Sequence, residues 1–252
     1  MEVIFLGTGT STGVPQIGCN CATCTSTDAR DKRLRTSVLV KTGGKNLLID
    51  CGPDFRTQAL NAGEKMQIDA VLVTHSHYDH VGGFDDLRPF CAQNPLAVFA
   101  RKDVLTDLKD RIPYCFKEHP YPGVPTFKLH EISNYKFNIG DIEIQPLPVW
   151  HYRLLINGYR IGKMAYITDA KTIDDSVIES LKGIDTLIIN ALRIKPHMSH
   201  MSLAESLAIV KQISPKRTFL IHISHDMGLH ANVSQILPAG VCLAYDGLTI
   251  TI

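Results

Sequence analysis

The chain has 252 residues, with 26 Lys and Arg against 25 Asp and Glu, a formal net charge of +1 and 44% hydrophobic residues. This balance provides enough apolar material for a core and excludes a disordered chain, a collagen-like repeat and a coiled coil. It also argues against nucleic acid as the main substrate, because proteins that neutralise phosphates usually carry a basic excess. We expect a single domain over residues 1–252.

The start of the chain lacks the basic residues and the apolar run of an export signal, and no stretch approaches the roughly 18 apolar residues of a membrane span. We therefore expect a cytoplasmic protein with no membrane partner. The seven Cys are an odd number, and Cys19, Cys21 and Cys24 lie within six positions. In an intracellular chain this clustering favours a metal site over a disulfide framework.

Short runs rich in Val, Ile, Leu and Thr recur along the chain between Gly, Asp, Asn and Pro residues, which is typical of β-strands. The predicted strands are Val3–Leu6, Ser37–Val40, Asn46–Asp50, Ala70–Thr74, Ala97–Ala100, Ile142–Leu147, Met164–Thr168, Thr186–Asn190, Thr218–His222 and Leu248–Ile252. Three pairs have the composition of hairpin turns: Gly43-Gly44, Asn157-Gly158 and Asp246-Gly247. We therefore expect the first half of the chain to be antiparallel.

Apolar residues at helical spacing predict three helices, over Lys102–Arg111, Thr172–Leu181 and Ser202–Ile213. Thr172 is a candidate N-cap, and the third helix begins with Ser202 and Glu205 in the S-x-x-E pattern of a capping box. Strands interleaved with helices indicate a layered α/β or α+β domain.

The most informative segment is His75-Ser76-His77-Tyr78-Asp79-His80, which follows a predicted strand. In an extended chain His75 and His77 point to the same side, and a turn into a helix lets Asp79 and His80 face the same point. Imidazole and carboxylate together suit Zn, Fe or Mn, and this group exceeds what one tetrahedral ion requires. Further ligand types stand where other predicted strands end, at His151, Asp169 and His222.

This order of residues resembles the ligand pattern of the metallo-β-lactamase superfamily, H-x-H-x-D-H followed by His, Asp and His. The resemblance implies a four-layer αββα sandwich with two catalytic divalent metals, Zn, Mn or Fe, at one edge of the sheets. In that family the first metal takes the residues that stand here at His75, His77 and His151. The second takes those at Asp79, His80 and His222, while Asp169 bridges both, and Asp79 is also counted as catalytic.

The opening stretch from Gly7 to Pro15, the Cys cluster and the closing Asp246-Gly247 resemble the PhnP-type cyclic phosphodiesterases, which are similar to the tRNA 3′-processing endonucleases. The endonucleases carry a long Gly/Pro-rich arm for tRNA, and no comparable insertion is evident. Three thiolates suit a structural zinc. The resemblance points to His225 as its fourth ligand, with His230 as the alternative.

The resemblance implies hydrolysis of a small, cyclic phosphodiester by a hydroxide that bridges the two metals. His200 stands where the phosphodiesterase branch has its catalytic His, and it would serve as general acid for the leaving alkoxide. Two alternatives stay open. One is hydrolysis of carbon esters, thioesters or lactones at the same centre, and the other is a non-catalytic metal- or nucleic-acid-binding module. A homodimer is a further expectation.

Four features have a more local interpretation. Asp50, at the end of a predicted strand, is expected to orient a ligand imidazole. The basic run from Arg30 to Arg35 is interpreted as a solvated connector. The glycines from Gly7 to Gly13 do not match a dinucleotide loop and indicate a close-approach loop beside the metal site. The Pro-rich segment from Ile112 to Pro125 is a surface loop and a candidate substrate lid.

Overall fold

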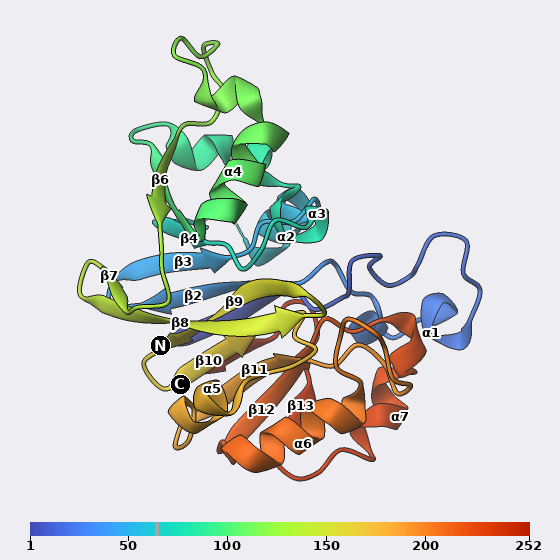
Figure 1. The fold of residues 1–252 in the computed structure, drawn as a ribbon. Helices are drawn as coiled ribbons and strands as arrows, with labels where there is room; N and C mark the ends of the chain where they lie inside the picture. Colours follow the sequence, from blue (N-terminus) through green and yellow to red (C-terminus); the bar gives the residue numbers. More distant parts are fainter. Residues whose placement is uncertain (64–65) are drawn as a thin grey trace.

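The computed structural model describes residues 1–63 and 66–252. Two seven-stranded sheets pack face to face, and helices cover the outer side of each (Figure 1). The predicted αββα sandwich is therefore confirmed.

The first sheet has the order β14-β1-β2-β3-β4-β5-β6. Its strands are β1 (Glu2–Gly7), β2 (Ser37–Thr42), β3 (Lys45–Ile49), β4 (Ala70–Leu72), β5 (Leu96–Ala100), β6 (Phe127–Glu131) and β14 (Thr249–Thr251). The pairs from β14 to β3 are antiparallel, whereas β3, β4, β5 and β6 run parallel. The expected antiparallel arrangement is wrong beyond β3, because helical connections carry the chain back across the sheet.

The second sheet has the order β13-β12-β11-β10-β9-β8-β7. Its strands are β7 (Phe137–Ile139), β8 (Ile142–His151), β9 (Leu154–Ile161), β10 (Met164–Ile167), β11 (Thr186–Asn190), β12 (Arg217–Ile221) and β13 (Val241–Leu243). The strands from β7 to β10 are antiparallel and those from β10 to β13 are parallel. Sequence patterns missed β6, β7, β9 and β13.

Helices cover both sheets. The first sheet carries α2 (Phe55–Ala62), α3 (Tyr78–Val81), α4 (Lys102–Arg111) and the 3₁₀ helices η2 (Phe84–Cys91) and η3 (Pro113–Phe116). The second carries α5 (Asp175–Ser180), α6 (Leu203–Ile213) and α7 (His230–Ser234), near η4 (His225–Met227). The short α1 (Ala22–Thr25) lies on an arm that projects beyond the sheets, followed by η1 (Ala29–Asp31). Across the described residues, we find no helix with the length and apolar character needed to traverse a bilayer.

The helix starts follow from local hydrogen bonds. The capping box at Ser202 is confirmed, since its hydroxyl accepts from the Glu205 amide and its own amide donates to the Glu205 carboxylate. Thr172 is not a cap, because its backbone pairs with Trp150 in both directions. Helix α5 therefore begins at Asp175, with Asp174 as its N-cap.

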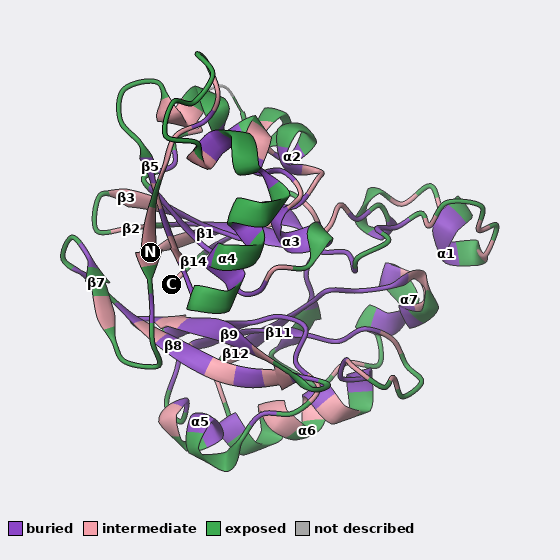
Figure 2. Cartoon of the chain, turned by 45° about the horizontal axis from the view of Figure 1, so that its top comes forward, coloured by how far each residue is buried: buried purple, intermediate pink, exposed green. Residues whose placement is uncertain are grey.

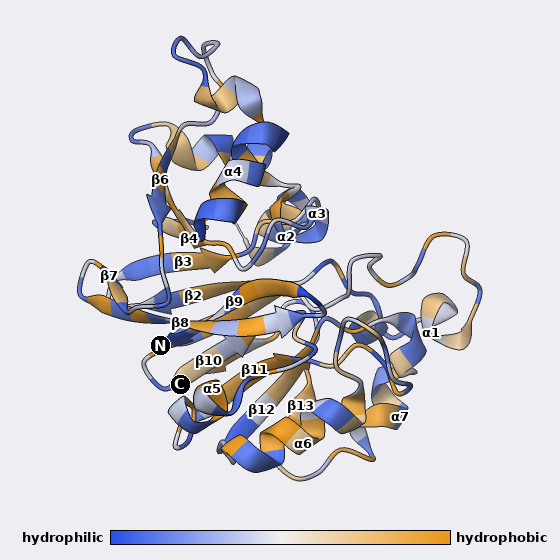
Figure 3. Ribbon diagram, viewed as in Figure 1, coloured by the Kyte–Doolittle hydropathy of each residue, from blue (hydrophilic) through white to orange (hydrophobic). Residues whose placement is uncertain are grey.

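Three apolar layers hold the sandwich together, one between the sheets and one beneath each set of helices. Strand β3 is buried on both faces, so its apolar residues do not alternate with polar ones. Leu47 and Ile49 face the other sheet, while Leu48 packs under the helices. A strand buried on both faces needs a continuous apolar run. Figure 2 shows buried strands between exposed helix surfaces, and Figure 3 shows hydrophobic residues along many of the same strands.

The Asn157-Gly158 pair lies inside β9 and not in a turn, so that prediction is wrong. A Cβ on Gly158 would lie 2.6 Å from the carbonyl oxygen of Tyr166, so the glycine allows β9 and β10 to pack closely. The β8–β9 turn is instead Tyr152-Arg153. Gly43-Gly44 is the predicted hairpin turn, whereas Asp246-Gly247 joins strands of different sheets.

The segment from Ile112 to Pro125 begins with η3 and continues without regular structure. The Tyr114 hydroxyl donates to Asp85, which fastens the start of the segment to η2. Its role as a lid stays a prediction.

Replacing Gly158 by Ala should destabilise the fold by about 1–3 kcal/mol, because the new methyl group meets β10 backbone that cannot move aside. Urea unfolding measures the effect. The matched control is Asn138→Ala, at an exposed strand position. Equal stability of the two variants would contradict the close packing of β9 on β10.

Candidate metal centre

The predicted ligands meet at one edge of the sandwich because each follows the end of a strand or begins a helix. His75 and His77 follow β4, and His151 is the last residue of β8. Asp169 follows β10, and His222 follows β12. The remaining two ligands come from the first turn of α3, at Asp79 and His80.

One group of ligand atoms comprises Asp79, His80, Asp169 and His222, all buried, with one atom from each within 4.8 Å of the others. His80 Nε2 lies 3.2 Å from Asp79 Oδ2. His222 Nε2 lies 3.2 Å from Asp169 Oδ2 and 3.5 Å from Asp79 Oδ2. Two carboxylates and two imidazoles thus face a single point.

The other three histidines form a second group beside the first. His75 Nε2 and His77 Nδ1 are 3.0 Å apart, and the rings of His77 and His151 lie 5.1 Å apart. Asp169 lies between the two groups: its Oδ1 is 3.4 Å from His80 Nε2, and its Oδ2 is 3.9 Å from His75 Nε2. The structure therefore brings together all seven predicted ligands.

Several atoms of the centre fit a divalent cation. Within the described part of the chain, His80 Nε2 and both ring nitrogens of His222 are buried without a hydrogen-bond partner. Burial lowers the pKa of His75 well below its ordinary value, which favours the neutral imidazole that binds metals. Burial opposes charge on His80 as well, but the carboxylates of Asp79, Asp169 and Asp50 hold its pKa well above the ordinary value. These carboxylates favour a positive charge beside them, and a bound divalent cation would supply that charge in place of the proton on His80.

The buried Asp50 contacts His80 directly and reaches His75 through Thr74. Its Oδ2 lies 2.7 Å from His80 Nδ1 and accepts a 2.8 Å hydrogen bond from the Thr74 hydroxyl. The hydroxyl oxygen of Thr74 lies 3.0 Å from His75 Nδ1. With both Nδ1 atoms donating, each ring presents Nε2 to the centre. The predicted contact between Asp50 and a candidate ligand imidazole is therefore present.

His200 also lies in the centre, carried by the loop before α6. Its Nδ1 is 3.8 Å from Asp169 Oδ2, and its ring lies 4.6 Å from that of His151 and 4.9 Å from that of His222. Burial lowers the pKa of His200 to about 3, although Asp169 acts in the opposite direction. The same loop orients His151, whose Nδ1 lies 2.8 Å from the Ser199 carbonyl oxygen. By position His200 can act as proton donor or as an additional ligand.

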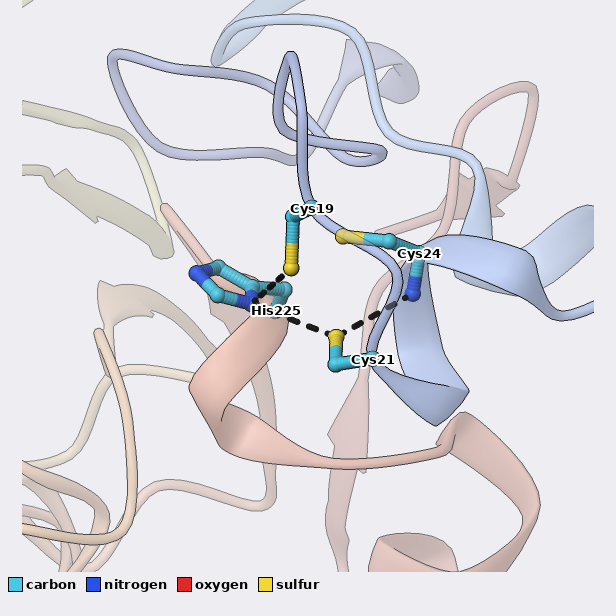
Figure 4. A group of neighbouring side chains, drawn as sticks. All are labelled: Cys19, Cys21, Cys24 and His225. Carbon is cyan, nitrogen blue, oxygen red and sulfur yellow. Dashed lines mark hydrogen bonds between the residues drawn. The ribbon is translucent and has the colours of Figure 1, made fainter.

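The Cys cluster forms a second, separate site on the projecting arm (Figure 4). His225 Nδ1 lies 3.4 Å from Cys19 Sγ and 3.3 Å from Cys21 Sγ, and one atom of each of the four residues lies within 4.8 Å of the others. The Cys24 amide and then the His225 ring lower the pKa of Cys21 to about 6, which favours the thiolate. Burial raises the pKa of Cys24 to about 11, so a cation would have to displace that proton. The alternative His230 lies elsewhere, against Arg33.

Arg33 corrects the interpretation of the basic run as a solvated connector, since its side chain is buried. Its guanidinium donates to the Thr8 hydroxyl at 2.8 Å and to the Ala244 carbonyl at 2.6 Å. Thr8 lies in the glycine-rich loop, where a Cβ on Gly9 would come within 2.8 Å of the Arg33 carbonyl oxygen. The loop exchanges backbone hydrogen bonds with Ile223, beside His222, so the predicted close-approach loop is confirmed. Because the hydrogen-bond partners of Arg33 lie far from it in the chain, the local sequence does not indicate that its side chain is buried.

The family described as "Beta-lactamase superfamily domain" matches residues 45–223. A curated relative, the "Octanoyltransferase" of Porphyromonas gingivalis, is 49% identical over 251 residues, which is 98% of this chain and 51% of that protein. The chain thus spans about half the length of this relative.

Two solved structures place the fold. A crystal structure described as a new diphosphatase from the PhnP family is 40% identical, with a TM-score of 0.92, and the match covers 100% of this chain and 97% of that one. The short form of human tRNase Z is 18% identical, with a TM-score of 0.74 and coverage of 100% and 99%, and supports the fold alone. From the ligand order at the strand ends, the family match and the 40% identical relative, we conclude that the chain belongs to the metallo-β-lactamase superfamily.

Proposed function

We propose that the protein is a metal-dependent phosphodiesterase that hydrolyses a small, cyclic phosphodiester. The observation that carries this proposal is the position of the buried Asp169 between the two groups of candidate ligands, 3.4 Å from His80 Nε2 and 3.9 Å from His75 Nε2. The diphosphatase name of the 40% identical relative supports chemistry at phosphorus.

Two divalent ions, Zn, Mn or Fe, would occupy the centre. His75, His77 and His151 would hold one, and Asp79, His80 and His222 the other, with Asp169 shared. Such a pair of ions activates water and offsets the charge on the phosphoryl oxygens during in-line displacement.

The chain's own residues fix the geometry that this reaction needs. Asp50 and Thr74 hold the rings of His80 and His75, and the Ser199 carbonyl holds the ring of His151. Buried imidazoles held from behind cannot rotate away, which keeps their lone pairs directed at one point.

His200 would supply the proton for the leaving alkoxide. Its Nδ1 has no hydrogen-bond partner among the described residues and lies 3.8 Å from Asp169 Oδ2. Burial disfavours the charged ring, and the anionic phosphodiester bound beside it would counteract that effect. The proton would thus be taken up where substrate is present.

Names of two relatives favour further candidates. Cleavage of a diphosphate is also a displacement at phosphorus. Phosphate is a better leaving group than an alkoxide, so this reaction would depend less on a proton from His200. The octanoyltransferase name favours acyl chemistry, yet the match leaves about half of that protein's length outside it. A non-catalytic module has the least support, because a degenerate centre has no need of all seven ligands.

We further propose a structural zinc at Cys19, Cys21, Cys24 and His225. Three sulfurs and one nitrogen form a closed tetrahedral donor set typical of such sites. The ion would join the projecting arm to η4, three residues after His222.

Metal-loaded protein should hydrolyse phosphodiesters faster than lactones or thioesters. The measurement compares bis(p-nitrophenyl) phosphate and five- and six-membered cyclic phosphates with a lactone and a thioester, each with Zn, Mn and Fe. Preference for the cyclic phosphates supports the proposal. A fully loaded protein that leaves every phosphodiester intact would contradict it.

His200→Ala should lower kcat by about 100- to 10,000-fold on a phosphodiester with a poor leaving group, because an alkoxide requires a proton. The loss should be much smaller with p-nitrophenolate as leaving group. The matched control is His130→Ala, on the edge strand β6. Loss of bound metal in step with activity, measured by elemental analysis, would instead make His200 a ligand.

Elemental analysis of the purified protein should find three metal ions per chain. Cys21→Ser should lose one of them and lower the unfolding temperature, whereas Cys242→Ser, at an exposed cysteine outside the cluster, should keep all three. A wild-type protein with two ions and full activity would contradict the structural zinc.

A further inference from the structure

Asn190 lies fully buried beside the candidate ligands. It is the last residue of β11, the strand between β10 and β12 in the second sheet. Its partner in β12 is Ile221, the residue before His222. Sequence patterns predicted this strand but gave the asparagine no role. A buried amide needs hydrogen-bond partners, so the contacts of its side chain indicate what it does.

The side-chain amide of Asn190 binds both polar backbone groups of Ala170. The Ala170 amide donates to Asn190 Oδ1 at 2.9 Å, and Asn190 Nδ2 donates to the Ala170 carbonyl at 2.9 Å. Ala170 directly follows Asp169 and is itself buried. The ladder between β10 and β11 ends at the pair Ile167 and Ile189. The asparagine side chain therefore joins the two segments beyond the last pair of the ladder.

The left-handed backbone of Asp169 explains why a side chain is needed for this contact. With a φ of 56°, Asp169 turns the chain away from the direction of β10, and Ala170 lies beyond the paired residues of the two strands. A primary amide has an acceptor and a donor on separate atoms, so it can satisfy a backbone N–H and a C=O together. A carboxylate has no donor, and an aliphatic side chain has neither group.

The loop that carries His200 is attached to the same residue. The Met201 amide donates to the Ala170 carbonyl at 2.9 Å, so this carbonyl accepts from both Asn190 and Met201. Asp169 precedes Ala170 in the chain, and His200 precedes Met201. His200 Nδ1 lies 3.8 Å from Asp169 Oδ2. Both side chains of this contact thus stand one residue before backbone that meets at Ala170.

We propose that Asn190 is a positioning residue that fixes Asp169 and His200 relative to each other. This inference rests on the proposed phosphodiesterase function, in which Asp169 is the shared metal ligand and His200 the proton donor. Asn190 acts through the backbone of Ala170, so loss of its amide would loosen both residues at once. Hydrogen bonds that orient metal ligands from outside the site change metal affinity or activity by about 10- to 100-fold.

The test replaces Asn190 by Ala and by Leu. Both variants lack the amide, but Leu keeps most of the side-chain volume, so an effect common to both comes from the lost hydrogen bonds and not from a cavity. Each variant should bind Mn²⁺ about tenfold more weakly in competition with a chelating dye. Each should also lower kcat about tenfold on a phosphodiester with an alkoxide leaving group, and less on bis(p-nitrophenyl) phosphate, with little change in KM.

Ser206→Ala is the matched control for the stability of this buried corner. The Ser206 hydroxyl donates to the Asn190 carbonyl at 2.7 Å. The variant therefore removes a hydrogen bond from the backbone of Asn190 but leaves the contacts of its side chain intact. The unfolding temperature should fall, whereas Mn²⁺ affinity and the dependence of kcat on the leaving group should remain those of the wild type.

A double variant separates positioning from general destabilisation. In a His200→Ala background, Asn190→Ala should lower kcat on the alkoxide substrate less than it does alone, because the proton donor is already missing. If both Asn190 variants match Ser206→Ala in Mn²⁺ affinity and in leaving-group dependence, the positioning role is wrong and the phosphodiesterase stands. Failure of the loaded wild type to hydrolyse any phosphodiester would instead overturn the proposed function, and Mn²⁺ affinity would still test whether Asn190 positions Asp169.

Discussion

Asp50 follows β3 with a φ of 63°, and its fully buried carboxylate lies against His80 and Thr74. Burial raises the pKa of this carboxyl group, and the charge of His80 acts against that effect. The carboxylate also accepts from the amide and the hydroxyl of Thr74. Through these contacts one buried charge orients His80 directly and His75 through Thr74. Such a charge is stable only while all its partners are present, so the geometry of both ligand groups depends on it.

The need to direct side chains at one point also explains the left-handed backbone at the candidate ligands Asp169 and His222. Asp169 and His222 follow strands β10 and β12, whose direct continuation would carry their side chains past the edge of the sheet. With φ of 56° and 54°, both turn back toward the centre. Each such residue costs about 1–3 kcal/mol. Apolar packing on both faces of the parallel strands supplies the stability that tolerates this cost.

Sequence patterns predicted the parts of the molecule that local chemistry decides. The ligands of α3 are adjacent in the chain, and the capping box of α6 needs only Ser202 and Glu205. Strand β9 was missed because Asn157-Gly158 has turn composition, and only the neighbouring β10 explains a glycine there. Arg33 was misread because its partners lie in the N-terminal loop and near the C-terminus. The position of His225 came from family resemblance, since a contact across 204 residues has no local pattern.

The projecting arm and the metal centre share one piece of backbone. His222 is followed at once by Ile223, which is hydrogen-bonded to Thr8 and Thr10 of the glycine-rich loop. Two residues later, His225 reaches the cysteines of the arm. His222 therefore stands between a strand of the second sheet and a segment that the N-terminal region holds from two sides. A displacement of the arm cannot leave His222 in place, because Ile223 transmits it through backbone hydrogen bonds and not through a flexible side chain. The arm is thus part of the frame that positions the candidate ligand His222.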